Sequence, residues 1–237
     1  MPLSARHALV TGGLGTIGRA YVAALGAAGV RVTVLDRPGG EAPPGTGFLG
    51  VDLNDLTGTE AAVAKAVVDD PIDILVNNAA LIINKPHEAF SLIEYEDQIR
   101  VNSSAAFVLA RVCAPAMKAA GWGRIVNMTS LTLTGQWDGY VPYVASKGAM
   151  LGLTKGLARE LGQYGITVNA ISPGAVVSDA ENRVFADRLA EYNDWVLDRQ
   201  CLKQRLQAED VANLLLFLVS DAARMISGQN IAIDGGW

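Results

Sequence analysis

The chain has 237 residues, of which 50% are hydrophobic and 18% charged, and its formal net charge is -5. This balance suits a globular protein with a large core, and the scattered lysines and arginines offer no basic patch for nucleic acid. The two cysteines, Cys113 and Cys201, and the two histidines lack the spacing of metal ligands, so no metal site is predicted. Without a long apolar run or a secretory signal, we expect a reduced, cytoplasmic protein that does not enter a membrane.

Strand-like apolar runs alternate with alanine-rich helical stretches along the whole chain. The predicted strands fall near residues 8–10, 30–35, 48–51, 72–76, 124–128, 166–171 and 230–233. Their successive apolar positions are typical of strands buried on both faces of a parallel sheet. No low-complexity linker interrupts this alternation. The sequence therefore predicts one α/β domain over residues 1–237, a doubly wound parallel sheet of about seven strands with helices on both faces.

A glycine-rich turn, residues 11–18, lies between the first strand and the first helix. Glycines let the backbone approach a pyrophosphate, and the helix N-terminus supplies N–H groups and a positive dipole end. Such turns often only connect two elements, but the position after a strand and before a helix favours a dinucleotide site. The fold is therefore predicted to be Rossmann-like, with cofactor contacts from Gly12, Thr16, Ile17 and Gly18.

Asp36 ends the second strand, where its carboxylate can accept hydrogen bonds from ribose hydroxyls and would repel a 2′-phosphate. This favours NAD over NADP. Arg37 leaves an alternative open, because it either binds that phosphate or stacks beside the adenine. Further cofactor contacts are predicted where the third and fourth strands end, although turn formation alone also accounts for Asp and Asn there: Asp52, Leu53, Asn78 and Ala79.

Tyr143 and Lys147 lie four residues apart in a stretch that is predicted to be helical to about Tyr164. Residues at this spacing share one face of a helix. A nearby ammonium lowers the pKa of a phenol, which would make Tyr143 an acid or base that is useful near neutral pH. An ordinary amphipathic helix can show the same spacing, so the rest of the chain must decide the meaning of this pair.

The order and spacing of these motifs resemble the short-chain dehydrogenase/reductase family over nearly the whole chain. The similar segments are residues 11–18, 77–80, 100–102, 173–174, 227–229 and 234–236, together with Ser130, which lies 13 residues before Tyr143. Three positions depart from the family pattern. Thr16 replaces a glycine and would crowd the pyrophosphate or hydrogen-bond to it, Ala80 replaces a glycine, and Ser178 replaces a threonine but keeps the hydroxyl.

The resemblance implies a catalytic set of Asn102, Ser130, Tyr143 and Lys147. Ser130 would hydrogen-bond the substrate oxygen, and Lys147 would lower the pKa of Tyr143 together with the positive nicotinamide and bind the ribose. Asn102 would hold a water that links Lys147 to solvent. Interrupting a helix by bonding to the backbone is the plainer interpretation, and the two roles are compatible. Nicotinamide contacts are implied for Pro173, Val176 and Ser178, besides the contacts of Tyr143 and Lys147 with the cofactor.

Residues 178–207 are predicted to cover the substrate as a lid. Phe185, Leu189, Tyr192 and Val196 recur at helical spacing with Trp195 beside them, and core packing is the plainer interpretation for most of them. Leu131, Leu133, Trp137 and Tyr140 would line the other wall, which favours an apolar or cyclic substrate. Lys203 and Arg205 are interpreted as solvated charges, with an anionic substrate as the alternative.

The function implied is an NAD-dependent oxidoreductase that interconverts a secondary alcohol and a ketone by hydride transfer, with Tyr143 as general acid/base. A 3-oxoacyl-carrier-protein reductase using NADPH is an alternative, against which Asp36 and the missing basic patch count. A catalytically silent nucleotide-binding scaffold is another, against which the complete catalytic set counts. The resemblance also implies a homotetramer built on the two long helices that flank the fifth strand.

Overall fold

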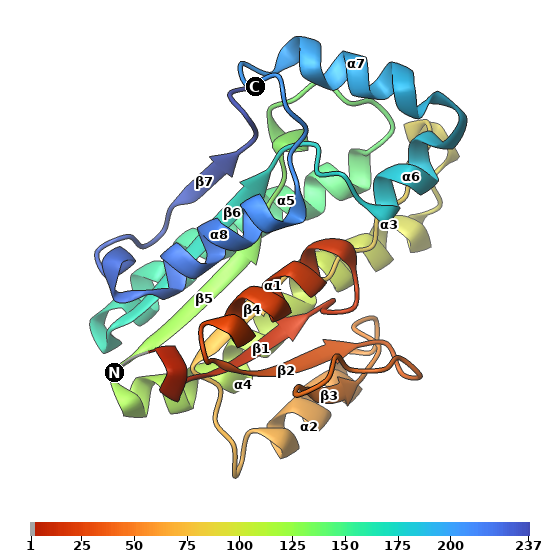
Figure 1. Ribbon diagram of the computed structural model, residues 1–237. Coiled ribbons are helices and arrows are strands. Elements are labelled where there is room, and N and C mark those ends of the chain that lie inside the picture. Colours follow the sequence, from red (N-terminus) through yellow and green to blue (C-terminus); the bar gives the residue numbers. More distant parts are fainter. Residues whose placement is uncertain (1–2) are drawn as a thin grey trace.

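The computed structural model describes residues 3–237; Met1 and Pro2, which the predicted domain includes, lie outside the described residues. Seven strands form one parallel sheet in the order β3-β2-β1-β4-β5-β6-β7 (Figure 1). The seven predicted strands are all present, with small shifts at their ends, so the predicted fold class is confirmed. They are β1 (His7–Thr11), β2 (Arg31–Asp36), β3 (Gly47–Gly50), β4 (Ile74–Asn77), β5 (Gly123–Met128), β6 (Ile166–Pro173) and β7 (Asn230–Ile233).

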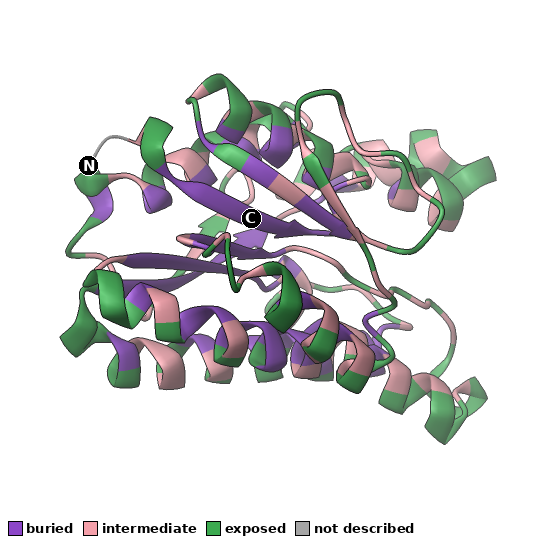
Figure 2. Ribbon diagram, turned by 90° about the horizontal axis from the view of Figure 1, so that it is seen from below, coloured by how far each residue is buried: buried purple, intermediate pink, exposed green. Residues whose placement is uncertain are grey.

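Helices cover both faces of the sheet, and Figure 2 shows the strands enclosed between the two helical layers. On one face α1 (Thr16–Ala27) packs against α8 (Ala208–Val219). The other face is covered by α2 (Leu56–Ala66), α4 (Ala105–Ala120) and α5 (Val141–Leu161), and α3 (Leu92–Ile99) packs on α5. Among residues 3–237, no helix combines the length and the apolar character needed to cross a bilayer.

The central strands are apolar because both of their faces are covered. β1, β4, β5 and β6 are buried at every position. Two amides in this core pair with each other, and one of them goes on to a hydroxyl: Asn77 Nδ2 donates to Asn127 Oδ1 at 2.8 Å, and Asn127 Nδ2 donates to Thr154 Oγ1 at 2.9 Å. These bonds join β4, β5 and α5 below the edge of the sheet where the predicted site residues lie.

β1 and β4 are neighbours in the sheet, although β2 and β3 separate them in the sequence. The chain therefore winds outward from β1 in one direction and returns to continue from β4 in the other. Such a switch of direction opens a crevice outside the carboxyl ends of the strands, which is where open α/β sheets bind ligands. The glycine turn follows β1 and Asn78 follows β4, so both segments border this crevice.

The segment 178–207 contains α6 (Asp179–Phe185) and α7 (Leu189–Arg199), which lie beyond the carboxyl ends of the strands in Figure 1. Its two ends are joined. Val176 and Leu206 form a parallel bridge, and Val177 N donates to Leu206 O at 3.0 Å. The segment is thus an excursion that leaves the sheet after β6 and returns to nearly the same place before α8.

Candidate active site

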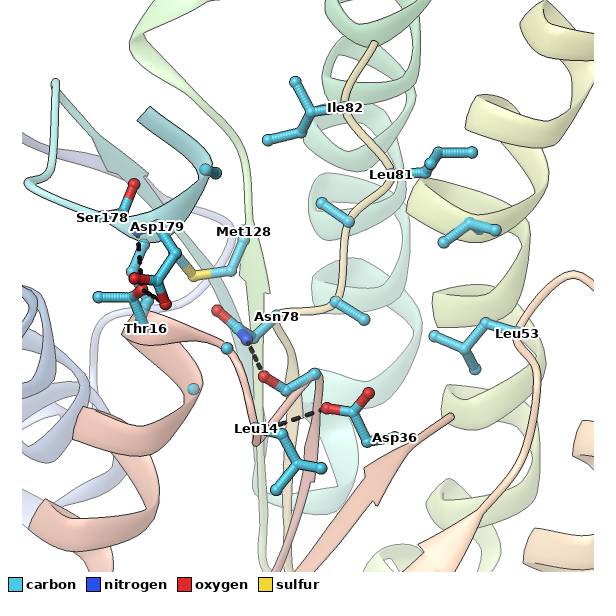
Figure 3. Close-up of a pocket in the computed structure, with 18 of the residues that line it drawn as sticks. Leu14, Thr16, Asp36, Leu53, Asn78, Leu81, Ile82, Met128, Ser178 and Asp179 are labelled. Carbon is cyan, nitrogen blue, oxygen red and sulfur yellow. Dashed lines mark hydrogen bonds between the residues drawn. The ribbon is translucent and has the colours of Figure 1, made fainter. Parts of the chain in front are cut away.

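A cleft of about 690 Å³ lies at the carboxyl edge of the sheet, where the connections that follow β1 and β4 run to opposite sides. It is bordered by the carboxyl ends of the six strands β1 to β6 and by the first turns of α1 and α6, and Figure 3 shows part of its lining. Every residue predicted to contact the cofactor lines this cleft: Gly12, Thr16, Ile17, Gly18, Asp36, Arg37, Asp52, Leu53, Asn78, Ala79, Tyr143, Lys147, Pro173, Val176 and Ser178.

The glycine turn brings backbone to the floor of the cleft. Gly12 has a φ of +64°, and a Cβ on it would lie 2.8 Å from Ala79 Cα. A Cβ on Gly18 would lie 2.0 Å from the carbonyl oxygen of Gly12, so neither position tolerates a side chain. Gly15 caps α1 without a side-chain hydrogen bond, which leaves the N–H groups of the first turn available to an anion. The turn therefore fits the pyrophosphate of a dinucleotide.

Thr11 holds the glycine turn against the end of β4. Its Oγ1 accepts hydrogen bonds from Asn78 N at 2.9 Å and from Ala79 N at 3.0 Å. In return Asn78 Nδ2 donates to the carbonyl oxygens of Thr11 and Gly12 at 3.0 and 3.1 Å. The two sides of the crevice are therefore locked together by buried polar contacts. Sequence reasoning did not assign Thr11 a role, although its place at the head of the glycine motif is a usable signal.

The Asp36 carboxylate is fixed at the end of β2 by two backbone N–H groups. Leu14 N donates to Oδ2 at 3.0 Å, as Figure 3 shows, and Arg37 N donates to Oδ1 at 2.8 Å. Arg37 also lines the cleft beside it. A negative charge therefore stands where the sequence placed the adenosine ribose, with a guanidinium on the adjacent residue.

Tyr143 is buried on α5 and lines the cleft with Ser130, which follows β5. Burial raises the pKa of Tyr143 to about 12, and a hydrogen bond with the Ser130 hydroxyl opposes this shift. The expected lowering of this pKa by Lys147 stays a prediction, because burial is the main cause of the observed direction and it also lowers the pKa of Lys147 to about 8.

Lys147 lies one helical turn after Tyr143, with Nζ 5.4 Å from the centre of the tyrosine ring. The side chain is buried, and Nζ donates to the carbonyl oxygen of Met128 at 2.9 Å. An isolated buried ammonium is costly, so this carbonyl at the end of β5 is what holds the lysine in the cleft. The contact could not be predicted from the sequence, because every residue carries a backbone carbonyl and residue type does not indicate which one accepts a hydrogen bond.

Asn102 lies in a π-helical turn, Arg100–Ser104, between α3 and α4. Its Oδ1 accepts from Leu81 N at 2.6 Å, and its Nδ2 donates to Leu81 O at 3.0 Å and to Ser146 Oγ at 2.9 Å. The geometry shows the bonds to backbone, and the role of Asn102 in holding a water stays a prediction. Asn102 also ties the segment after β4 to α5, one residue away from Lys147. Such π-helical turns occur frequently at functional sites.

Five aromatic side chains gather where α6 and α7 approach the loop before α5. Trp137 stacks on Trp237 with centroids 4.6 Å apart, and Phe185 stacks on Tyr192 at 3.6 Å. Trp195 contacts both tryptophans at 5.2 Å, and Trp137 Nε1 donates to Tyr192 Oη at 3.3 Å. We call Trp137, Phe185, Tyr192, Trp195 and Trp237 the aromatic cluster. It joins the 178–207 segment to the loop that follows Ser130. Val196 is fully buried, in agreement with the interpretation that it packs in the core.

Arg205 is not the solvated charge that the sequence suggested. Its side chain is 12% exposed and forms an ion pair with Glu181, whose side chain is 6% exposed. Burial raises the pKa of Glu181 in spite of the opposing Arg205 charge. The pair links the first turn of α6 to the irregular stretch just before Leu206, where the excursion returns to the sheet. Lys203, in contrast, is exposed as expected and donates to the carbonyl oxygens of Leu197 and Asp198.

No cluster of three or more His, Cys, Asp or Glu side chains that could hold a metal ion occurs within residues 3–237. The two cysteines are both free, Cys113 buried in the core and Cys201 exposed.

Comparisons with known proteins agree with this geometry. A family model described as Enoyl-(Acyl carrier protein) reductase matches residues 13–237. The chain is 34% identical to carbonyl reductase [NADPH] 2 of Sus scrofa, covering 100% of this chain and 98% of that protein. It is 33% identical to a 3-oxoacyl-[acyl-carrier-protein] reductase of Aquifex aeolicus (strain VF5), covering 99% and 98%. Among solved structures, a gluconate 5-dehydrogenase from Burkholderia cenocepacia J2315 in complex with NADP and tartrate superposes with a TM-score of 0.90 at 30% identity, covering 97% of this chain and 94% of that one.

The fold, the glycine turn and the Ser130, Tyr143 and Lys147 constellation define a nicotinamide-dependent oxidoreductase that acts on CH–OH groups. The chain belongs to the short-chain dehydrogenase/reductase family, as its motifs indicated.

Proposed function

We propose that the protein interconverts a secondary alcohol and a ketone, with Tyr143 as the general acid/base at the carbinol oxygen. The observation that carries this proposal is the meeting of Tyr143, Ser130 and Lys147 inside the cleft that also contains the glycine turn. A bound nicotinamide dinucleotide would supply the hydride acceptor or donor. It would be held by the first turn of α1 and by Pro173, Val176 and Ser178 across the cleft.

In the oxidation direction, the Tyr143 phenolate takes the hydroxyl proton of the substrate as the carbinol C–H bond gives up its hydride. Ser130 donates to the substrate oxygen, where negative charge develops. In the reduction direction the protonated Tyr143 returns the proton to the carbonyl oxygen. Because burial favours the protonated phenol, the positive charge of the oxidised nicotinamide is needed to lower the pKa of Tyr143 toward neutrality.

Lys147 and Asn102 support this exchange from the other side of Tyr143. The Lys147 ammonium lies beside the ring and, with a pKa near 8, can lose and regain a proton near neutral pH. Asn102 fixes the backbone of Leu81 at the cleft wall and lies against α5 through Ser146. We assign Lys147 to ribose binding and proton relay. Asn102 is assigned to holding the relay's path to solvent.

We propose NAD as the preferred cofactor, with NADP as the alternative. The support is the Asp36 carboxylate, fixed by Leu14 N and Arg37 N at the end of β2, because it repels a 2′-phosphate. Arg37 in the cleft lining supports the alternative, and so do two relatives, one named as NADPH-dependent and one solved with NADP. A comparison of the two cofactors in one assay decides between them.

The substrate is proposed to be a small molecule with an apolar or cyclic body. The aromatic cluster supports this, because its Trp137 lies in the loop between Ser130 and Tyr143 and aromatic rings bind flat apolar surfaces. Arg205 is neutralised by Glu181 and so gives no free cation for an anionic substrate. Residues 178–207 are proposed to act as the lid over this substrate.

A 3-oxoacyl-carrier-protein reductase is the second candidate, and the relative from Aquifex aeolicus favours it. The net charge of -5 counts against it, because the acidic carrier needs a basic surface. A silent scaffold is disfavoured by the presence of Ser130, Tyr143 and Lys147 in one cleft. A homotetramer and a cytoplasmic location stay predictions; the exposed Phe107 on α4 and Val141 on α5 support the assembly.

The test is the nicotinamide absorbance change of the wild type beside Tyr143→Phe, with NAD and NADP and with apolar cyclic alcohols. An acetoacetyl thioester with NADPH serves as the second arm. We expect turnover with NAD that falls by about 10²–10⁴-fold in Tyr143→Phe, the usual share of a general acid/base, with unchanged cofactor binding. A variant with near wild-type turnover would remove Tyr143 from the mechanism.

A further inference from the structure

Thr16 is the one position of the glycine turn whose side chain departs from the family motif, and its hydroxyl reaches across the mouth of the cleft. Thr16 Oγ1 donates to Asp179 Oδ2 at 3.1 Å, and Asp179 N donates back to Thr16 Oγ1 at 3.2 Å. Figure 3 shows the two side chains facing each other beside Ser178. The sequence suggested that this hydroxyl would crowd the pyrophosphate or hydrogen-bond to it. In the structure the hydroxyl instead joins the first residue of α1 to the first residue of α6.

Arg19 completes this contact. Its Nη2 donates to Asp179 Oδ2 at 3.1 Å, and its Nη1 donates to the carbonyl oxygen of Leu14 at 2.6 Å. The guanidinium thus connects Asp179 to the glycine turn a second time and balances its charge. We call Thr16, Arg19 and Asp179 the clasp.

The clasp joins the same two segments between which the cofactor is proposed to lie. The glycine turn and the start of α1 form one side of the cleft, and the stretch from Pro173 to Ser178 forms the other. Ser178, next to Asp179, uses its hydroxyl to cap α6 by accepting from Glu181 N at 3.2 Å. A dinucleotide that spans from the glycine turn to Ser178 would therefore lie under the clasp.

The clasp is built from contacts that can part at modest cost. The Arg19 and Asp179 side chains are 56% and 63% exposed, and ion pairs at such positions contribute little because water screens them. The reciprocal Thr16 contact is a pair of neutral or charge-assisted hydrogen bonds of ordinary length. A buried, strong contact would hold the cleft shut, whereas this one suits a segment that must open for every cofactor exchange.

We propose that Thr16 is a positioning residue whose hydroxyl holds the start of the lid across the nucleotide turn and slows the release of bound cofactor. This inference rests on the proposed use of a nicotinamide dinucleotide. Without the hydroxyl, α6 keeps only the exposed Arg19 contact to α1, and the cofactor leaves faster, while Ser130 after β5 and Tyr143 and Lys147 on α5 keep their places. The expected signature is a change in cofactor dissociation rather than in the chemical step.

The experiment measures the dissociation rate of NADH and of NADPH by stopped-flow fluorescence for the wild type, Thr16→Val, Thr16→Ser and Thr16→Gly. Valine keeps the shape but removes the hydroxyl, serine keeps the hydroxyl, and glycine restores the family's residue. We expect the rate to rise about five- to tenfold in the valine and glycine variants, the range of one hydrogen bond, and to stay within about twofold in serine. The KM for cofactor should rise with little loss of kcat.

Asp179→Ala supplies the matched partner. The Thr16→Val/Asp179→Ala double variant should accelerate release by less than the product of the two single effects, because both variants break the contact between Thr16 Oγ1 and Asp179 Oδ2. Equal dissociation rates in the wild type and in Thr16→Val and Thr16→Gly would overturn the clasp alone. The clasp would also be overturned if cofactor dissociation were as fast in Thr16→Ser as in Thr16→Val. The effect would then come from the shape of the side chain and not from its hydroxyl. A wild type that binds neither NADH nor NADPH would overturn both the clasp and the proposed function.

Discussion

The groups proposed for the chemistry and the segment proposed to cover the substrate are held in place by different kinds of contact. Lys147 and Asn102 bond to backbone atoms of Met128 and Leu81, and Thr11 bonds to the backbone after β4. Within the 178–207 segment, α6 and α7 are tied to the body through side chains, in the clasp and in the aromatic cluster, whereas backbone bonds hold the end of the segment near Leu206. The catalytic groups move only if the sheet moves. The side-chain contacts of the 178–207 segment, in contrast, can be removed by single substitutions.

This difference implies that substitutions at the two places should have separable effects. Changes at the carboxyl edge of the sheet should alter the rate of the chemical step and its dependence on pH. Changes in the segment should alter the binding and release of ligands and the local stability of α6 and α7. The following tests compare the two regions directly.

Arg205→Met should have the largest effect on the segment. It leaves Glu181 buried without its partner, and breaking a buried ion pair costs about 3–5 kcal/mol. We expect hydrogen exchange to speed up across residues 178–207 while β1 and β4 to β6 stay protected. The control is Lys203→Met, which removes an exposed charge of the same excursion. Equal loss of protection in the strands would show that the segment and the sheet unfold as one unit.

The pH profile should report on the sheet side. Burial raises the pKa of Tyr143 to about 12, and one nearby positive charge lowers a pKa by about 1–3 units, so the phenol stays mostly protonated at pH 7 with oxidised cofactor bound. The kcat/KM for alcohol oxidation should therefore rise about tenfold per pH unit between about pH 7 and 9. Ketone reduction, which needs the protonated phenol, should show no such rise. An oxidation rate that is flat from pH 7 upward would contradict this assignment.

Trp137→Ala should have the smallest effect of the three and should act on the substrate. It removes the stacking partner of Trp237 and the donor to Tyr192 Oη. Aromatic contacts of this kind contribute about 0.5–1.5 kcal/mol each, so we expect the substrate KM to rise several-fold with little change in cofactor dissociation. Trp137→Phe keeps a ring but loses the N–H, so its substrate KM should lie between those of the wild type and Trp137→Ala. An unchanged KM in Trp137→Ala would remove the aromatic cluster from substrate recognition.

The parts of the site that the sequence predicted share one property: they recur at fixed positions relative to strand ends. Gly12, Asp36, Asn78 and Ser130 each follow a predicted strand, and parallel strands bring their carboxyl ends to one edge. Once the strands were recognised, their convergence in one cleft followed. Tyr143 and Lys147 were found because helical periodicity puts them on one face.

The parts that were missed or wrong depend on where side chains meet in space. Asp179 opposite Thr16 and Glu181 under Arg205 are pairs separated by 163 and 24 residues, and no local pattern announces either contact. The spacing of Tyr143 and Lys147 reveals their proximity but not their burial. Burial raises the pKa of Tyr143 and lowers that of Lys147.

The sequence by itself determined the parallel sheet, the family and the chemical groups at the carboxyl edge, because strand periodicity and glycine placement are local properties of the chain. Only the tertiary structure decided how the 178–207 segment is fastened, which charges are neutralised inside it and how strongly Tyr143 resists ionisation. These depend on solvent exclusion and on contacts between distant residues, and neither is encoded in spacing along the chain.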